Sequence, residues 1–234
     1  MNDEPTTERD QSRPPLFGSL GFLLLNLPIG IAGFVAIVAL GSVGATTLII
    51  WIGIPVLALL LVGMRAAART ERARVYSMLG AYVPLPYRTL PEGDQKARWK
   101  ARIADQSTWR DMTYFVLLFP IGIAQFTILA VSWALSLGFI GLPVYYRFLP
   151  EGAYFFPSFD LRWITVDSEL SALPWAALGL LCLALTIAIT RALASAHVRF
   201  ARLMLGPTPR QMREADNFVP FTPSVRASGP VAES

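Results

Sequence analysis

The sequence predicts an all-α integral membrane protein with four transmembrane helices arranged as two hairpins. Of the 234 residues, 54% are hydrophobic and only 15% are charged, and the mean hydropathy is +0.49, whereas soluble domains carry about 25% charged residues. Three stretches contain no Asp, Glu, Lys or Arg, namely 14–64, 112–146 and 170–190, which hold 51, 35 and 21 residues. Because a spanning helix needs about 20 apolar residues, these stretches fit two spans, one span and one span.

The spans are expected at about 20–42, 45–64, 112–136 and 173–193, within one membrane domain that covers 16–207. Polar tails at 1–15 and 208–234 are expected to be disordered. Residues 137–144 follow the third span without a charge. The sequence leaves open whether they continue that span.

The distribution of basic residues predicts the orientation in the membrane. The loop 65–111 carries ten basic and five acidic residues, and the chain from Arg191 onward carries six and three. The segment 145–172 has two basic and four acidic residues. Since Lys and Arg beside spans stay in the cytoplasm, we expect a multi-pass plasma-membrane protein with both termini and 65–111 cytoplasmic and 145–172 outside.

Three pairs of segments indicate an internal duplication. The run 28–34 (PIGIAGF) recurs at 120–126 (PIGIAQF), and 53–56 (GIPV) resembles 141–144 (GLPV). Residues 65–80 match 191–206 at six of sixteen positions. The offsets are 92, 88 and 126, and they predict parallel-repeat hairpins, each followed by a basic cytoplasmic helix. The second copy would carry an extracytoplasmic insert of about 38 residues, the difference between the last two offsets.

The cytoplasmic loop carries the first group of candidate site residues. In the run 105–111 (DQSTWRD), Thr108 and Asp111 resemble a capping box for the third span, and Trp109 suits the headgroup layer. The arginines of 65–74 are most simply headgroup anchors. The alternative is a signal relay, and its candidate residues are Glu71, Arg72, Asp105, Thr108, Trp109, Arg110 and Asp111.

The outer segment 145–172 is rich in aromatic and acidic residues. An interfacial belt accounts for many of the aromatic side chains. The alternative is a surface that contacts a ligand, with carboxylates that attract a cation or a cationic peptide. Its candidate residues are Tyr154, Phe155, Phe156, Asp160, Trp163 and Asp167.

The sequence lacks the residues that several classes of function require. The single Cys182 is expected to pack among apolar side chains, and the single His197 to lie on a helix surface. We therefore expect no catalytic residues, no cofactor and no metal site. The uncharged spans disfavour a coupled transporter, which needs ionisable groups inside the membrane. The basic excess is explained by topology, so no nucleic-acid partner is expected.

The order of these motifs resembles a known family. Glu71-Arg72 in a basic stretch ending Leu79-Gly80, and 105–111 leading into Phe119-Pro120-Ile121-Gly122, are similar to the sensor-domain family of actinobacterial two-component histidine kinases. The resemblance covers about 16–207. In such kinases the domain precedes a dimerisation helix with the phosphoacceptor histidine and an ATP-binding domain. This sequence ends at Ser234 without them, so we expect a stand-alone sensor-like domain.

The leading hypothesis is a membrane sensor without kinase activity that relays a signal to a separate partner. Besides the lipid bilayer, the expected partners are a histidine kinase, another signalling protein or a second copy of the chain. Two alternatives remain. One is a transport component, such as a permease partner or small channel subunit, and the other is a structural or lipid-organising membrane protein.

Overall fold

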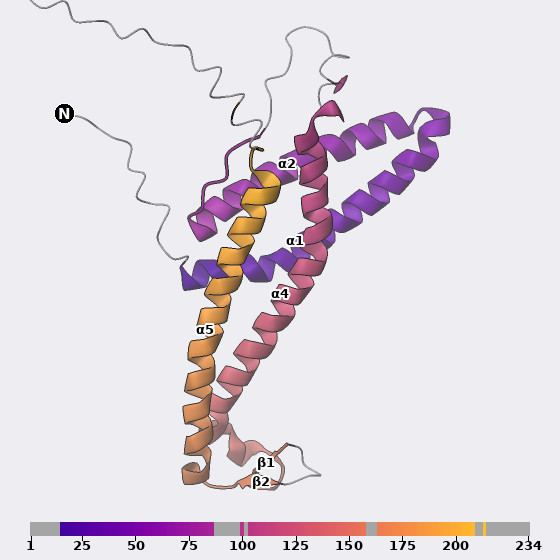
Figure 1. Cartoon of the computed structure of the whole chain (residues 1–234). Helices are drawn as coiled ribbons and strands as arrows, with labels where there is room; N and C mark the ends of the chain where they lie inside the picture. The colour runs from indigo at the N-terminus through magenta and orange to yellow at the C-terminus, as the bar shows by residue number, and fades with distance from the viewer. Residues whose placement is uncertain (1–14, 87–98, 101–102, 158–162, 209–212, 214–234) are drawn as a thin grey trace, which may run out of the picture.

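The computed structural model describes residues 15–86, 99–100, 103–157, 163–208 and 213. Four long helices dominate this part of the chain (Figure 1), and they are α1 (Leu16–Thr46), α2 (Gly53–Leu79), α4 (Gln106–Tyr145) and α5 (Glu169–Leu205). All four are long and apolar enough to cross a membrane, which confirms the predicted helical membrane fold. The two tails, apart from Pro15, Thr208 and Arg213, lie outside the described residues.

The helices form two hairpins that close in different ways. The short helix η2 (Thr47–Ile50) joins α1 to α2. Between α4 and α5 lie η3 (Tyr146–Phe148), η4 (Pro150–Gly152) and an antiparallel pair of strands, β1 (Tyr154–Phe156) and β2 (Ile164–Val166), with Phe155 opposite Thr165. The hairpins cross where α1 meets α4, and their closed ends point away from each other (Figure 1).

The structure settles one helix boundary that the sequence left open and differs from the prediction at another. Residues 137–144 continue α4 up to Tyr145, which answers the question that the sequence left open. The basic stretches are not separate helices, because 65–79 and 191–205 are the second halves of α2 and α5. They contain no glycine or proline that would interrupt a helix. Gly80, with φ 68°, then ends α2 in the left-handed conformation that glycine adopts at little cost.

The predicted capping box at Thr108 and Asp111 is wrong. Helix α4 begins three residues earlier, with Asp105 as its N-cap, and the Asp105 carboxylate accepts a hydrogen bond of 3.1 Å from the Ser107 backbone N–H. Asp is a preferred N-cap residue, so it takes this position before Thr108 can. Thr108 and Asp111 therefore lie inside the helix, and both are buried.

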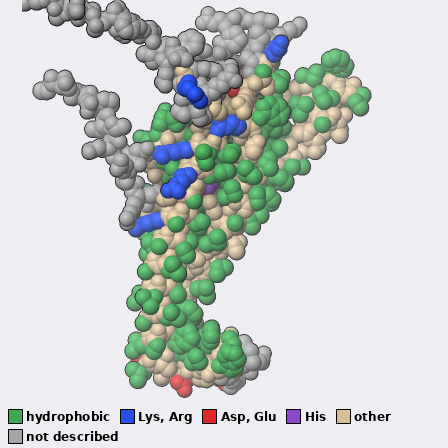
Figure 2. Space-filling model, viewed as in Figure 1, with side chains coloured by type: hydrophobic (Ala, Val, Ile, Leu, Met, Phe, Trp, Pro, Cys, Tyr) green, Lys and Arg blue, Asp and Glu red, His purple; other side chains and the backbone are tan. Residues whose placement is uncertain are grey.

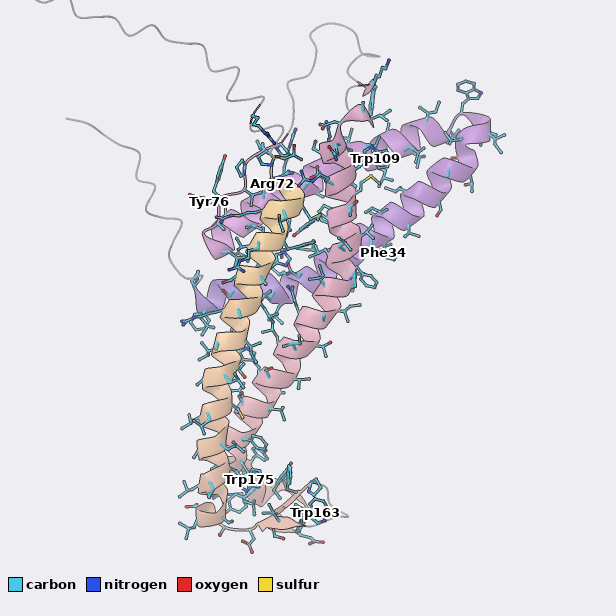
Figure 3. The ribbon with its side chains drawn as sticks, viewed as in Figure 1. Phe34, Arg72, Tyr76, Trp109, Trp163 and Trp175 are labelled. Atoms are coloured by element: carbon cyan, nitrogen blue, oxygen red, sulfur yellow. The ribbon has the colours of Figure 1, made fainter. Side chains whose placement is uncertain are left out.

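The hairpins cross at two glycines that approach each other's helices reciprocally. A Cβ atom added at Gly30 would lie 2.9 Å from the Leu118 carbonyl oxygen, and one added at Gly122 would lie 2.9 Å from the Asn26 carbonyl oxygen. These glycines belong to the two copies of the repeated heptapeptide. Beside them the rings of Phe34 and Phe119 stack at 4.8 Å between centroids; Figure 3 labels Phe34.

Buried positions in the two hairpins follow the same register. For each buried residue of α1, the residue 92 positions later in α4 is also buried. The buried positions of α1 are 19, 22, 23, 26, 30, 33 and 44. For each buried residue of α2, the residue 126 positions later in α5 is also buried. The buried positions of α2 are 53, 60, 64, 68, 71, 72, 75 and 79. Equivalent positions therefore face the interior in both hairpins.

The middle segment pair of the sequence comparison is not equivalent in space. Residues 53–56 begin α2, whereas 141–144 lie near the end of α4. Gly53 approaches Leu48 in the first hairpin, and Gly179 approaches Ile140 in the same way in the second. The two glycines are 126 positions apart, and Leu48 and Ile140 are 92 positions apart. The second hairpin is thus longer by 34 residues, the difference between these offsets, instead of about 38.

Candidate functional site

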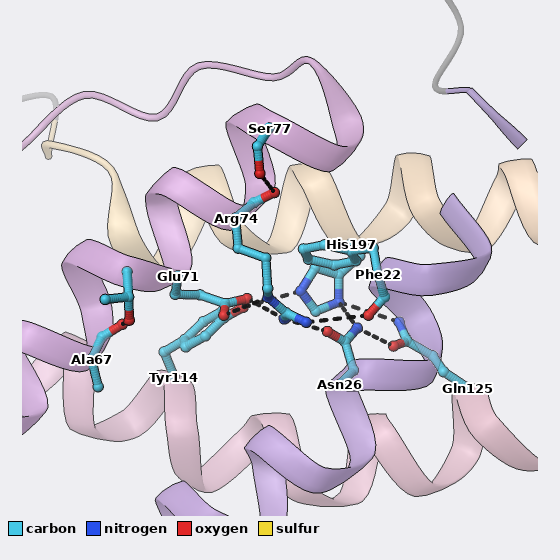
Figure 4. Close-up of polar contacts among 10 residues, drawn as sticks. Phe22, Asn26, Ala67, Glu71, Arg74, Ser77, Tyr114, Gln125 and His197 are labelled. Atoms are coloured by element: carbon cyan, nitrogen blue, oxygen red, sulfur yellow. Dashed lines mark hydrogen bonds and ion pairs between the residues drawn. The ribbon is translucent and has the colours of Figure 1, made fainter. Parts of the chain in front are cut away.

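A cluster of buried polar side chains lies where the four helices meet (Figure 4). We call it the central network, and its members are Asn26 from α1, Glu71 and Arg74 from α2, Tyr114 and Gln125 from α4, and His197 from α5. Asn26 and Tyr114 are fully buried, His197 is 1% exposed and Glu71 is 3% exposed. Each helix contributes at least one member, so the network connects both hairpins.

A bidentate ion pair forms one end of the central network. Arg74 donates from Nη2 to Glu71 Oε1 at 2.6 Å and from Nε to Oε2 at 3.0 Å. Its Nη2 also donates to Asn26 Oδ1 at 2.6 Å, and its guanidinium lies 4.1 Å from the centroid of the Phe22 ring. Arg74 therefore ties α2 to α1 through both charge and aromatic contact.

The arginine determines the hydrogen-bond polarity of the rest of the network. Because Arg74 can only donate, Asn26 presents its oxygen to it and its NH2 group to Gln125 Oε1, at 2.8 Å. Gln125 then presents its own NH2 to His197 Nδ1, at 3.3 Å, and Asn26 Nδ2 lies 3.2 Å from the same atom. With two donors facing it, Nδ1 accepts, which assigns the proton of a neutral His197 to Nε2.

Tyr114 closes the network into a continuous chain. Its hydroxyl accepts from His197 Nε2 at 3.0 Å and donates to Glu71 Oε1 at 2.8 Å. Each polar side chain of the central network thus has a hydrogen-bond partner of the right kind, which is what burial of such groups requires. The arrangement links α5 to α2 through a side chain of α4.

A second group, which we call the α5 clamp, holds the C-terminal end of α5. Arg72 from α2 donates to the Leu205 carbonyl at 2.9 and 3.1 Å and pairs with Asp111 of α4 at 3.0 Å. Arg110 donates to the carbonyl oxygens of Leu203 and Gly206. The last carbonyls of a helix have no partner within it and carry partial negative charge, so cationic donors suit them.

A third contact fixes the start of α4 against α2. Arg65 pairs with Asp105 at 2.6 Å between Nη2 and Oδ2, and its Nε donates to Thr108 Oγ1 at 2.8 Å. Arg65, Arg72 and Arg74 therefore bind other helices, and interpreting them as headgroup anchors was wrong. The predicted relay residues are divided among three groups, with Glu71 in the central network, Arg72, Arg110 and Asp111 in the α5 clamp, and Asp105 and Thr108 at this contact. Trp109 is 53% exposed and donates to the Ile103 carbonyl.

The predicted ligand-contacting residues do not form one site. Phe155 is 8% exposed, and Tyr154 packs against a small core of Leu142, Val166 and Ala172. The Phe156 ring lies 5.2 Å from that of Trp175, while Trp163, labelled with Trp175 in Figure 3, is 75% exposed. Asp167 is exposed, and Asp160 lies outside the described residues.

A cavity at this end of the molecule is lined by residues other than the predicted ligand-contacting ones. It measures about 500 Å³ and is lined by Pro143, Val144, Arg147, Phe148, Glu169 and Leu173. None of the predicted ligand-contacting residues is among them. The aromatic side chains of β1 thus support the closed end of the hairpin.

Sequence reasoning missed most of the central network. His197 was expected on a surface and is buried, because α5 turns this face toward Tyr114 and the amides. Two signals could have located the site. Asn26 is the only amide side chain of α1, and Gln125 is the only substitution between the two copies of the repeated heptapeptide.

Among the described residues, no group of three or more His, Cys, Asp or Glu side chains could hold a metal ion. The buried charges are already engaged by helices of the same chain. The arrangement is suited to fixing the relative position of the four helices.

Comparison with known proteins gives one match. A family model described as "Putative sensor" matches residues 22–205, which include the central network and most of the α5 clamp. No curated protein and no solved structure matches the chain. Since the model covers well over half of the sequence, this membrane protein belongs to the "Putative sensor" family.

Proposed function

We propose that this protein is a membrane sensor that converts a change in the packing of its two hairpins into a change at the C-terminal end of α5. Membership in a sensor family favours a non-enzymatic role. In this proposal the chain acts without kinase activity of its own and passes the signal to a separate partner. The partner is a histidine kinase, another signalling protein or a second copy of the chain.

The α5 clamp is the observation that carries this proposal. Arg72 belongs to the first hairpin and Arg110 to the second, yet both bind carbonyls at the end of α5. A small shift of one hairpin against the other would break one set of these bonds and leave the other. Packed helix interfaces change between discrete arrangements, which gives such a shift two defined end states.

The membrane orientation supports an output on the cytoplasmic side. Figure 2 shows blue Lys and Arg side chains gathered around the end of the molecule where α5 ends, whereas green hydrophobic side chains cover both hairpins. We propose that both termini lie in the cytoplasm and that 145–172 lies outside. A reporter that works only outside the cell should be active when fused after Gly152 and inactive after Gly93.

The repeat gives the proposal its geometry. We infer that the hairpins are two copies of one unit, because buried positions correspond at constant offsets. Helices α1 and α4 run antiparallel where they cross, since Gly30 approaches Leu118 while Gly122 approaches Asn26. Related hairpins can rock about their shared crossing at Gly30 and Gly122 without losing their core. The central network then favours one of the positions, since its bonds require one alignment of all four helices.

Isolation of the protein from native membranes in mild detergent tests the relay. We expect a stoichiometric complex with a kinase, a response regulator or a second copy, and we expect Arg72→Gln to weaken it. Arg199→Gln changes an exposed arginine of α5 that lies outside the α5 clamp, and it should leave the complex unchanged. Recovery of the monomer alone would contradict the proposal, as would solute flux in reconstituted vesicles, which a transport component would produce.

A further inference from the structure

The two uncharged stretches of the α4–α5 hairpin end at charged residues that meet in space. Arg147 directly follows the uncharged stretch 112–146, and Glu169 directly precedes the uncharged stretch 170–190. Their side chains form an ion pair of 3.0 Å between Nη2 and Oε1. Charges are costly inside a membrane, so this ion pair marks the level at which the hairpin leaves the hydrocarbon core.

The length of α5 agrees with this boundary. The 21 residues 170–190 measure about 32 Å as a helix, and the hydrocarbon core of a bilayer measures about 30 Å. Arg191 follows at the other end of the same stretch. Glu169 and Arg191 therefore lie close to the two opposite surfaces of the membrane.

The cavity of about 500 Å³ at the closed end of this hairpin lies across the boundary. Arg147 and Glu169 line it together with Pro143, Val144, Phe148 and Leu173. Pro143, Val144 and Leu173 belong to the uncharged stretches, so the cavity has charged walls at the boundary and apolar walls on the membrane side. Its volume is within the range of small-molecule sites, about 300–1,000 Å³.

The apolar walls of the cavity are open to its surroundings. Val144 and Leu173 are exposed, and Phe148 is 81% exposed. Exposed apolar side chains directly beside a charged pair favour a ligand that is apolar in one part and charged in another. Membrane lipids combine an acyl chain with a charged headgroup in this order from the hydrocarbon core outward.

A ligand can replace the ion pair at little cost. The side chains of Arg147 and Glu169 are 53% and 75% exposed, and such pairs contribute little net stability. A guanidinium has five N–H donors, and among the described residues Arg147 bonds to Glu169 through Nη2. Its guanidinium also lies 5.7 Å from the centroid of the Tyr146 ring, which helps to hold it in place. Arginine in this state can bind a phosphate with two parallel hydrogen bonds.

The carboxylate determines which headgroup fits beside the phosphate. An ionised Glu169 only accepts hydrogen bonds, so it suits a ligand cation that carries N–H donors. A primary ammonium has three such donors, whereas the quaternary ammonium of choline has none and is typically bound by aromatic cages. One cation and one anion at the cavity rim also match a zwitterionic headgroup better than one with a net charge.

We propose that this cavity binds a phospholipid whose headgroup carries a phosphate and a primary ammonium, such as phosphatidylethanolamine. The phosphate binds Arg147, the ammonium binds Glu169, and an acyl chain lies along Val144 and Leu173. Binding of this lipid requires only that the second hairpin lie in a membrane, and it does not depend on a relay to a partner.

Native mass spectrometry of the detergent-purified protein with defined lipids tests the site. We expect phosphatidylethanolamine to bind about tenfold or more tightly than phosphatidylcholine with the same acyl chains, because choline cannot donate a hydrogen bond to the carboxylate. Glu169→Gln should abolish this preference and still bind both lipids, which shows that the variant is folded. Arg147→Gln should weaken both lipids, since both carry the phosphate.

Two exposed residues outside the cavity lining provide matched controls. Asp167→Asn removes an acid two residues before Glu169, and Arg191→Gln removes the arginine at the other end of the stretch 170–190. Both variants should bind the two lipids like the unaltered protein. Equal affinity of the unaltered protein for both lipids would overturn the proposal. A preference that survives Glu169→Gln, or lipid binding that Arg147→Gln leaves unchanged, would overturn it as well.

Glycerophosphoethanolamine, which has the same headgroup without acyl chains, distinguishes a membrane lipid from a soluble ligand. We expect it to compete about tenfold or more weakly than the lipid, because it buries no acyl chain against Val144 and Leu173. Competition as strong as that of the lipid would overturn the proposal in favour of a soluble phosphate ester. These measurements require no signalling partner, so the proposed function can fail while the lipid site stands.

Discussion

The α1–α2 and α4–α5 hairpins share their buried positions and differ in what fills them. Arg74 lies over the ring of Phe22 in the first hairpin, and at the corresponding positions Phe200 stacks on Tyr114 in the second. Glu71 corresponds to His197, and these two side chains meet at the Tyr114 hydroxyl. The buried positions that the two hairpins share provide the packing of the core. The side chains that differ between equivalent positions form the central network.

This difference gives the molecule a single polar centre. At several paired positions only one copy is polar, as with Phe22 and Tyr114, Asn26 and Leu118, Gly33 and Gln125, and Arg74 and Phe200. Because only one member of each of these pairs is polar, the repeat produces one network instead of two equivalent ones. That network needs side chains from both hairpins. We infer that the shared positions maintain the fold and that the differing positions hold the hairpins in one arrangement.

Removing the carboxylate of Glu71 should break this arrangement with the largest effect. Glu71→Gln leaves Arg74, which is 12% exposed, without a counter-charge, and loss of one partner of a buried pair costs about 3–5 kcal/mol of unfolding free energy. Unfolding in mixed micelles measures the change. Arg199→Gln, at an exposed site, should stay within about 0.5 kcal/mol. A loss from Glu71→Gln as small as that of the control would show that the network does not hold the hairpins.

Arg72→Gln should loosen the end of α5 in particular. It removes charged donors from the Leu205 carbonyl and from Asp111, and such bonds contribute about 1.5–3 kcal/mol. Hydrogen exchange should become faster in the last turn of α5 and remain unchanged around Ser136 and Thr186. Uniformly faster exchange along α5 would mean that the clamp has no local role.

The reciprocal glycines test the similarity of the hairpins. Gly30→Ala and Gly122→Ala each place a methyl group 2.9 Å from opposing backbone, so each should lose about 1–3 kcal/mol, and by similar amounts. Gly138→Ala meets no atom within 4 Å and lies in α4, so it should be neutral or gain up to about 1 kcal/mol. Clearly unequal losses at positions 30 and 122 would contradict the reciprocal crossing.

Ser136→Ala should have the smallest effect and concerns a contact of the second hairpin alone. Ser136 and Thr186 bond at 2.9 Å between α4 and α5, whereas the corresponding Gly44 and Leu60 cannot. Hydrogen bonds between membrane helices contribute about 0.6 kcal/mol, and Thr186 keeps a second bond to the Ser132 carbonyl. Thermal unfolding in detergent measures the loss. A change above that of Gly30→Ala would show that the contact does more than join two helices.

Composition and charge spacing were enough to predict the fold class and the four apolar helices, because uncharged stretches of this length have few other solutions. The candidate relay residues were identified in the cytoplasmic loop as the alternative to a helix cap and headgroup anchors, and in the structure all but Trp109 join helices. The boundaries were harder. Helix α4 starts at Gln106 because Asp105 caps it, and the choice between two capping residues depends on tertiary contacts of Thr108 and Asp111.

The central network could not be predicted from spacing, since its members come from four helices and are up to 171 residues apart in sequence. His197 was the clearest failure. A single histidine among arginines is ordinarily exposed, and its burial depends on the amides of Asn26 and Gln125. The repeat itself held the missing information, because residues that differ between buried equivalent positions mark the network.

Distances between the two closed ends test the central inference most directly. Spin labels at Ile49→Cys and Leu170→Cys, in the Cys182→Ala background, report how the hairpins are arranged in lipid. We predict one narrow distance distribution that Arg199→Gln leaves unchanged and that Glu71→Gln broadens or splits in two. An unchanged distribution in Glu71→Gln would contradict the conclusion that the central network fixes the hairpins in one arrangement.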